Sequence, residues 1–212
     1  MDLVTILAKE FGKLYEKNFD GYFIAKGVLK LSNNSYYKVL EMDYNLKSKI
    51  IRDNLSVKIC ESSIFLADKK NATLILTLMK PKSNRNFKDR IENYNWQKTL
   101  SEFNIEEGTS CKRKFYKKKK CFTKEEILTF CSFVGDFNSI HQGRNAVVPG
   151  MMILKYIVEN IAKENIRFTT LNIRFLEPLF VEEVFNLKID DEYFLVYSKN
   201  KLFIRGKFLN EE

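Results

Sequence analysis

The sequence predicts an α+β protein in which an antiparallel sheet wraps around a central helix, and three observations support that fold class. Residues 151–162 are apolar on nearly every side, as expected of a helix enclosed by other elements. Residues 21–79 are rich in Tyr, Val, Ile and Leu between polar breaks, which is typical of strands. Alternating runs follow the buried helix and predict an antiparallel meander: 168–176, 184–189, 193–197 and 202–208.

The composition is that of a folded protein with an ordinary core. Hydrophobic residues make up 45% and charged residues 30% of the 212 positions, which excludes disordered and collagen-like classes. No apolar run reaches the ~20 residues that a membrane helix needs, and the first residues lack a signal-peptide pattern. We therefore expect a cytoplasmic protein without a membrane partner. The four cysteines form no C-x-x-C pair, so we expect reduced thiols and no metal site.

The first half begins with an amphipathic helix at residues 3–15, where apolar side chains recur every three or four positions. The strands predicted after it are 22–31, 35–44, 55–66 and 72–79. The polar break at 67–71 predicts a hairpin with a five-residue loop. A polar, basic stretch at 80–106 then predicts a connection between two structural units.

The second half begins with a clear helix signal. Thr123 and Glu126 form a capping-box pattern, in which each side chain can bind a backbone N–H of the other residue. Gly135 suits the end of this helix, because glycine accepts the left-handed conformation common there. The residues after Gly135 are therefore presented at a helix C-terminus.

Those residues read Gly-Asp-Phe-Asn-Ser-Ile-His from Gly135 to His141, and His141 is the only histidine of the chain. A lone histidine is more often structural than catalytic. Here, however, Asp136 accompanies it, and the helix that follows has free N–H groups at its start, which favour anions. An acid–base pair beside an oxyanion site is the outline of a catalytic centre.

The segment 133–141, with Ala146 and residues 147–151 after it, resembles the hydratase motif of MaoC-like proteins, the hotdog-fold (R)-specific enoyl-thioester hydratases and dehydratases. Residues 172–179 are similar to the family's R-F-x-x-P strand, so the resemblance covers roughly 107–208. It implies a hotdog fold whose central helix is 149–163. The sequence departs from the family pattern at Ser139, where proline is usual, and in a shorter loop before Gly150.

The family also includes double-hotdog chains with a degenerate first copy. We therefore predict a β-rich unit at 1–103 and a MaoC-like hotdog domain at 104–212. The first unit is either a degenerate hotdog or an unrelated module, in which case the catalytic hotdog pairs with a second chain. A homodimer is the expected assembly.

The resemblance implies a lyase of fatty-acid metabolism that hydrates trans-2-enoyl thioesters to (R)-3-hydroxyacyl thioesters, or performs the reverse dehydration. It assigns acid–base catalysis to Asp136 and His141, a supporting role to Asn138, and the oxyanion hole to the N–H groups of Gly150 or Met151. No cofactor is implied beyond the coenzyme A or acyl carrier protein that carries the substrate. The alternative is a hotdog protein that binds acyl-CoA or acyl carrier protein without turnover.

The net charge of +9 favours anionic partners, and its densest part is 112–120, where seven of nine residues are cationic. This run is either a solvated strand or linker, or a docking surface for the phosphates of the carrier. The candidate docking residues are Lys117, Lys118, Lys119 and Lys120. Nucleic acid is not the expected partner, because no helix-turn-helix, zinc-finger or RNA-binding aromatic motif accompanies the charge.

Overall fold

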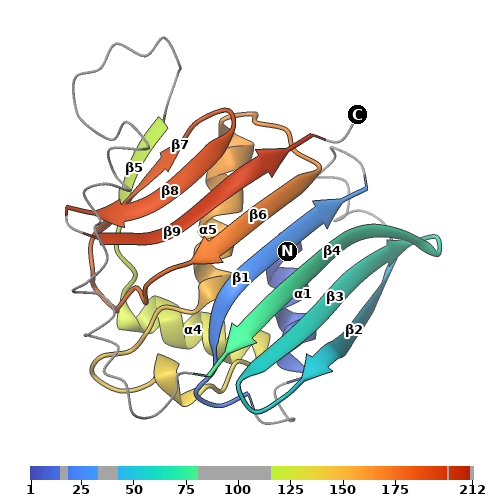
Figure 1. The fold of residues 1–212 in the computed structure, drawn as a ribbon, viewed down its shortest axis with the longest axis horizontal. Coiled ribbons are helices and arrows are strands. Elements are labelled where there is room, and N and C mark those ends of the chain that lie inside the picture. Colours follow the sequence, from blue (N-terminus) through green and yellow to red (C-terminus); the bar gives the residue numbers. More distant parts are fainter. Residues whose placement is uncertain (15–18, 33–42, 81–115, 200, 211–212) are drawn as a thin grey trace.

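The computed structural model describes residues 1–14, 19–32, 43–80, 116–199 and 201–210, which form one nine-stranded sheet with helices on one face (Figure 1). The first half contains α1 (Leu3–Gly12), β1 (Phe23–Leu31), β2 (Tyr44–Asp53), β3 (Val57–Leu66) and β4 (Lys69–Met79). The second half contains β5 (Tyr116–Lys120), α4 (Lys124–Val134), η3 (Ser139–His141), α5 (Gly150–Lys163), β6 (Thr170–Phe175), β7 (Phe185–Ile189), β8 (Tyr193–Ser198) and β9 (Lys201–Leu209).

The sheet is continuous across the two halves of the chain. Its strand order is β2-β3-β4-β1-β6-β9-β8-β7-β5, and every neighbouring pair is antiparallel. The halves join where β1 pairs with β6, with Gly27 opposite Ile173. The predicted boundary at 103/104 lies outside the described residues, and a duplicated hotdog stays a prediction.

The core lies between the sheet and two helices that share its covered face. In Figure 1, α1 lies behind β1 and β4, and α5 behind β6 and β9. The two helices contact each other, and α1 also contacts α4, β2 and β3. Side chains such as Val4, Leu7, Ile157 and Ile161 are completely buried. Full burial of each such side chain contributes roughly 1.5–3 kcal/mol, so this packing stabilises the frame around the site.

Local signals placed the helices of the second half correctly. Thr123 accepts from the backbone N–H of Glu126, and the Glu126 carboxylate accepts from that of Thr123, completing the capping box. Gly135 ends α4 in the left-handed conformation, with φ 74°. The predicted buried helix is α5. No helix in the described ranges is long and apolar enough to cross a membrane.

Three details of the strand prediction were wrong or fall elsewhere. Most of the predicted strand 35–44 lies outside the described residues, whereas β2, which was not predicted, occupies Tyr44–Asp53. This strand was missed because it is an edge strand with mostly exposed, charged residues. The meander holds only for β7, β8 and β9: β6 pairs with β9 rather than β7.

The hairpin between β3 and β4 is also tighter than predicted. Only Ala67 and Asp68 form its loop, and both have positive φ, 45° and 62°. Two consecutive residues of this kind match the right-handed twist of the flanking strands. The polar residues 69–71 belong to the strand, where they were mistaken for loop because of their exposure and charge.

Candidate active site

The loop between α4 and α5 brings Asp136 and His141 together. Asp136 follows the left-handed Gly135, and His141 ends the short helix η3. His141 Nε2 lies 3.3 Å from Asp136 Oδ2, and the two side chains are only 7% and 11% exposed. The sequence motif thus becomes a contact between two titratable groups largely shielded from bulk water.

The orientation of the His141 ring is set by its other nitrogen. Nδ1 lies 2.7 Å from the carbonyl oxygen of Val147, which can only accept, so Nδ1 carries a proton and donates it. Nε2 is then the nitrogen that faces Asp136. A bare Nε2 and a carboxylate are both acceptors, so their contact is favourable only with a proton between them or with a water that donates to both. Either arrangement suits proton transfer.

Val147 is itself held in place, which fixes the carbonyl that orients His141. The N–H of Val147 donates to the carbonyl oxygen of Ile140 at 2.8 Å, and an isolated antiparallel β-bridge pairs Val147 with Phe180. The next residue, Val148, donates to Leu179 at 2.8 Å. The segment 179–180, which follows the strand that resembles the family's R-F-x-x-P pattern, therefore supports the residues leading into α5.

Asn138 is buried, 2% exposed, and all its polar groups are used by the protein. Its backbone N–H donates to Asp136 Oδ1 at 3.1 Å. Its side-chain oxygen accepts from Gly21 at 3.0 Å and from Ile140 at 3.4 Å, and Nδ2 donates to the Tyr22 carbonyl at 2.9 Å. Through these bonds Asn138 holds the loop in place.

The helix α5 begins at Gly150 with an uncapped N-terminus. Pro149 occupies the N-cap position and makes no side-chain cap bond. The first N–H groups of a helix have no partner within it, and they carry the positive end of the helix dipole. A Cβ on Gly150 would meet Ile24 Cδ1 at 2.8 Å and Phe175 Cε1 at 3.2 Å, so glycine lets β1 and β6 approach the helix start.

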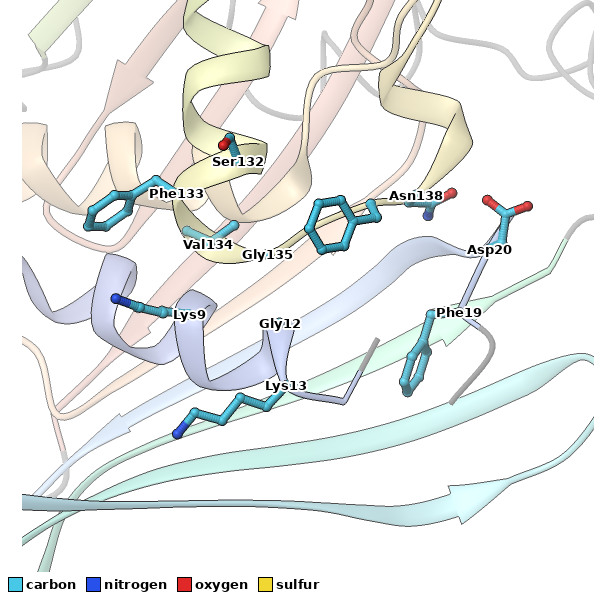
Figure 2. A pocket seen from close by; sticks show the side chains of 11 residues that line it. Lys9, Gly12, Lys13, Phe19, Asp20, Ser132, Phe133, Val134, Gly135 and Asn138 are labelled. Carbon is cyan, nitrogen blue, oxygen red and sulfur yellow. The ribbon is translucent and has the colours of Figure 1, made fainter. Parts of the chain in front are cut away.

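A cleft of about 480 Å³ opens beside the same loop, between the C-terminal ends of α1 and α4 (Figure 2). Gly135, Phe137 and Asn138 line it, whereas Asp136 and His141 do not, so it adjoins the acid–base pair without including it. In Figure 2, Asp20 lies beside Asn138 at one end, and the Phe19 ring points away from it. Its other lining residues are Lys9, Gly12, Lys13, Ser132, Phe133 and Val134.

Several of these residues come from the first half of the chain, and the sequence analysis did not identify them. No local motif marks Lys9, Phe19 or Asp20. The one available signal was the amphipathic helix at the start of the chain, which had to cover some apolar surface. Only the packing of α1 against α4 shows that this surface borders the motif loop.

The lysines proposed for docking lie on the edge strand β5, and none of them lines the cleft. Lys118 pairs with Glu164 at 3.4 Å, and Lys120 pairs with Glu126 at 2.6 Å. At least two of the four candidates, Lys118 and Lys120, thus have carboxylate partners within the chain. The docking role stays a prediction.

Two of the three cysteines in the described part of the chain, Cys60 and Cys131, are buried. Burial raises the pKa of Cys60 to about 11 and that of Cys131 to about 12, so neither is a thiolate at neutral pH. Among the described residues, no group of three or more His, Cys, Asp or Glu side chains could hold a metal ion. Cys111 lies outside them.

The comparisons with known proteins give the class of fold. No protein-family model matches the sequence, and no curated protein does. Among solved structures, HtdX from Mycobacterium tuberculosis matches with a TM-score of 0.64 and 11% identity, over 99% of this chain and 88% of that one. A MaoC-like dehydratase matches with a TM-score of 0.64 and 10% identity, over 100% and 84%.

Thioesterases share the fold as well. A Lactobacillus plantarum protein provisionally named an oleoyl thioesterase matches with a TM-score of 0.57 and 9% identity, over 99% of this chain and 87% of that one. Identities this low show the fold alone. The chain therefore has the hotdog fold, which confirms the predicted fold class. MaoC-like dehydratases are among its structural neighbours, in agreement with the motif resemblance.

Proposed function

We propose that the protein is an acyl-thioester hydratase or dehydratase that interconverts trans-2-enoyl and (R)-3-hydroxyacyl thioesters carried on coenzyme A or acyl carrier protein. The observation that supports this most is the 3.3 Å contact between His141 Nε2 and Asp136 Oδ2, in a loop that leads into the uncapped start of α5. Structural neighbours that include MaoC-like dehydratases and thioesterases support thioester chemistry in general.

The geometry suggests how the two side chains divide the reaction. In hydration, a water held by Asp136 and His141 loses a proton to the pair as its oxygen bonds to C3 of the substrate. The electron pair of the double bond moves toward the thioester, and the pair returns a proton to C2. His141 takes part through Nε2, because its Nδ1 proton is engaged by Val147. Acid–base catalysis of this kind is typically worth ~10²–10⁴-fold.

The helix start supplies the second half of the mechanism. As the double bond is attacked, negative charge develops on the thioester oxygen. The N–H groups of Gly150 or Met151 can donate to that oxygen, and one such donor is typically worth ~3 kcal/mol. The cleft beside the loop offers apolar walls for part of the substrate, among them Phe19 and Val134.

The decisive experiment is a hydration assay on a series of trans-2-enoyl-CoA substrates, in which the loss of the enoyl absorbance measures turnover. We expect turnover by the wild type and a loss of at least about 10²-fold in Asp136→Asn and His141→Ala, both folded by circular dichroism. Absence of turnover in the wild type on every chain length, and on acyl carrier protein substrates, would reject the proposal.

Two other outcomes of this experiment would assign the protein a different function. Release of free thiol, measured in the same reactions, would identify a thioesterase. A melting shift with acyl-CoA but no chemistry would identify a binding protein. The expected homodimer is tested separately by light scattering of the purified chain, and the expected cytoplasmic address by fractionating cells that express it.

A further inference from the structure

Three hydrogen bonds tie the motif loop to a short segment of the first half, residues 19–22. Asp20 Oδ1 accepts from the N–H of Ser139 at 2.8 Å. The N–H of Gly21 donates to Asn138 Oδ1 at 3.0 Å, and Asn138 Nδ2 donates to the Tyr22 carbonyl at 2.9 Å. The partners are 116 to 119 positions apart in the sequence, so the contact is purely tertiary.

These bonds reach Asp136 through Asn138, and they reach His141 through the short helix that begins at Ser139. Asn138 donates to Asp136, so its side-chain bonds to residues 21 and 22 fix the amide that holds the carboxylate. Ser139 is the first residue of η3, which ends at His141. The bond from Asp20 therefore fixes the start of the turn that carries the imidazole.

The segment itself is anchored firmly enough to act as a fixed point. Phe19 and Tyr22 are 3% and 7% exposed, and their rings meet edge to face at 6.5 Å. The Tyr22 hydroxyl donates to the Leu55 carbonyl at 3.1 Å, in the turn between β2 and β3. Lys58 Nζ lies 5.4 Å from the centre of each of the two rings. Asp20 is the exposed member between these buried neighbours, and Figure 2 shows it beside Asn138.

We propose that residues 19–22 form a clamp that positions the motif loop, with Asp20 as a positioning residue that acts on His141 through Ser139. The catalytic part of this inference rests on the proposed function. It makes the first half of the chain a component of the active site rather than a separate module, because the loop is held from outside its own half.

The identity of residue 139 decides whether the hydrogen bond to Asp20 can form. A serine at this position has an N–H to donate, whereas proline has none but fixes its own φ near −65°. Hydrogen bonds from the Ser139 hydroxyl and N–H hold the pKa of Asp20 below its ordinary value of 3.8, so the ionised carboxylate is the bound form. The Asp20 carboxylate thus restrains the backbone at Ser139 by a hydrogen bond, as a proline ring would restrain it covalently.

Proline is also compatible with the backbone at this point. Asn138 has φ −62° and ψ 125°, the extended conformation that a residue before proline prefers. Position 139 is the first of a helical turn, where proline is well tolerated. Ser139→Pro therefore removes the bond to Asp20 while restraining the same backbone, which makes it a rescue variant.

The experiment compares kcat and KM for an enoyl-CoA substrate in four variants. We expect Asp20→Ala to lower kcat about tenfold with KM changed less than about twofold, since small misplacements of catalytic groups are costly. Asp20→Asn, which keeps the accepting oxygen, should stay within about twofold of wild type. Ser139→Pro alone, and combined with Asp20→Ala, should stay within about threefold. Asp43→Ala, an exposed aspartate of the same half, is the matched control.

A second readout does not depend on activity, because His141 is the only histidine. Its Nδ1 proton, bound to Val147, should give one protected imidazole signal in ¹H–¹⁵N spectra of the wild type. That signal should exchange with water faster in Asp20→Ala and recover in the double variant. If the wild type turns over no thioester, the proposed function fails but this readout still judges the clamp.

Some results would overturn the clamp. An Asp20→Ala variant with wild-type kcat and an unchanged imidazole signal would show that Asp20 positions nothing. Equal losses in Asp20→Asn and Asp20→Ala would assign the effect to charge rather than to the hydrogen bond. A double variant worse than Asp20→Ala would contradict the proposed equivalence of the bond and the proline ring.

Discussion

The two helices on the covered face of the sheet begin in opposite ways. In α1, Asp2 caps the first turn: Oδ1 accepts from the N–H of Thr5 at 2.9 Å, and Oδ2 from its hydroxyl at 2.6 Å. In α5, Pro149 stands at the equivalent position with no side-chain acceptor. The first half thus caps its helix with a carboxylate of its own, whereas the second half leaves its helix without a side-chain cap.

The same contrast extends to the rest of each half. The only histidine, the Asp136–His141 contact and the uncapped helix all belong to the second half. The first half contributes anchored backbone and side-chain groups that hold the loop, through residues 19–22. The proposed chemistry therefore falls to one half and its support to the other, although both share one sheet.

The strongest way to sharpen this comparison is to alter one glycine in each half. In Gly150→Ala, the new Cβ meets Ile24 Cδ1 at 2.8 Å and Phe175 Cε1 at 3.2 Å, so either these side chains or the helix start must shift, and we expect kcat to fall about tenfold or more. In Gly27→Ala, the nearest atoms stand at 3.4 and 3.9 Å, so kcat should change less than about twofold. Equal effects in the two variants would contradict the division.

The capped helix should matter for stability alone. Asp2→Ala removes the cap of α1 and is expected to cost about 1 kcal/mol. For a chain of this size, that lowers Tm by about 2–4 °C. The specific activity of the folded fraction should not change, because no part of the proposed site uses this helix end. A fall in kcat at constant KM would break the comparison.

The buried carboxyl of Glu177 is expected to lower the stability of the second half at neutral pH. Burial raises the pKa of this carboxyl, Glu183 adds to the effect and Lys201 opposes it. Its Oε1 is buried with no hydrogen-bond partner among the described residues. The pKa of Glu177 in the folded protein lies above its ordinary value of 4.5. The contribution of this carboxyl to the free energy of unfolding is therefore fully present below pH 4.5, and it is lost as the pH rises through the folded pKa.

We therefore expect Glu177→Gln to be more stable than wild type by about 1 kcal/mol at pH 7 and no more stable at pH 4. Urea unfolding at the two pH values measures this difference. Glu125→Gln, an exposed carboxylate on α4, is the control and should show no such pH dependence. A uniform gain at both pH values would mean that packing, not ionisation, is responsible.

The smallest expected effect concerns the basic strand. Lys119→Glu should raise KM for an enoyl-CoA about twofold at low salt without lowering kcat, if β5 attracts the phosphates of the carrier. Because the charge is exposed, the effect should disappear at about 1 M salt. Lys69→Glu, in the hairpin of the first half, should leave KM unchanged. An effect on kcat instead of KM would remove the docking role.

The elements that the sequence predicted well are those whose signals are local. The capping box at Thr123 depends on residues within one helical turn, and the apolar segment of α5 on residues within one helix. The edge strand β2 was missed because none of its side chains is fully buried and polar or charged residues interrupt its apolar positions. The pairing of β6 with β9 was missed because strand order depends on long-range contacts.

In the candidate site, too, the features with local sequence signals were predicted and those that depend on long-range contacts were not. The approach of Asp136 to His141 follows from a motif of seven consecutive residues, which a single turn can bring together. The contribution of residues 19–22 does not, because nothing in Asp20 or Gly21 indicates a partner more than 110 positions away. The need for glycine at 150 also depends on Ile24 and Phe175, which only the folded sheet brings to the helix.

Among the described strands, the sheet ends at β5 on one side and β2 on the other, and both outer strands are rich in cations: Lys117, Lys118 and Lys119, and Lys47, Lys49 and Arg52. Two molecules approaching edge to edge would bring like charges together, which opposes the strand addition that leads to fibrils. The charge on these two outer strands thus opposes edge-to-edge growth of the sheet at low ionic strength.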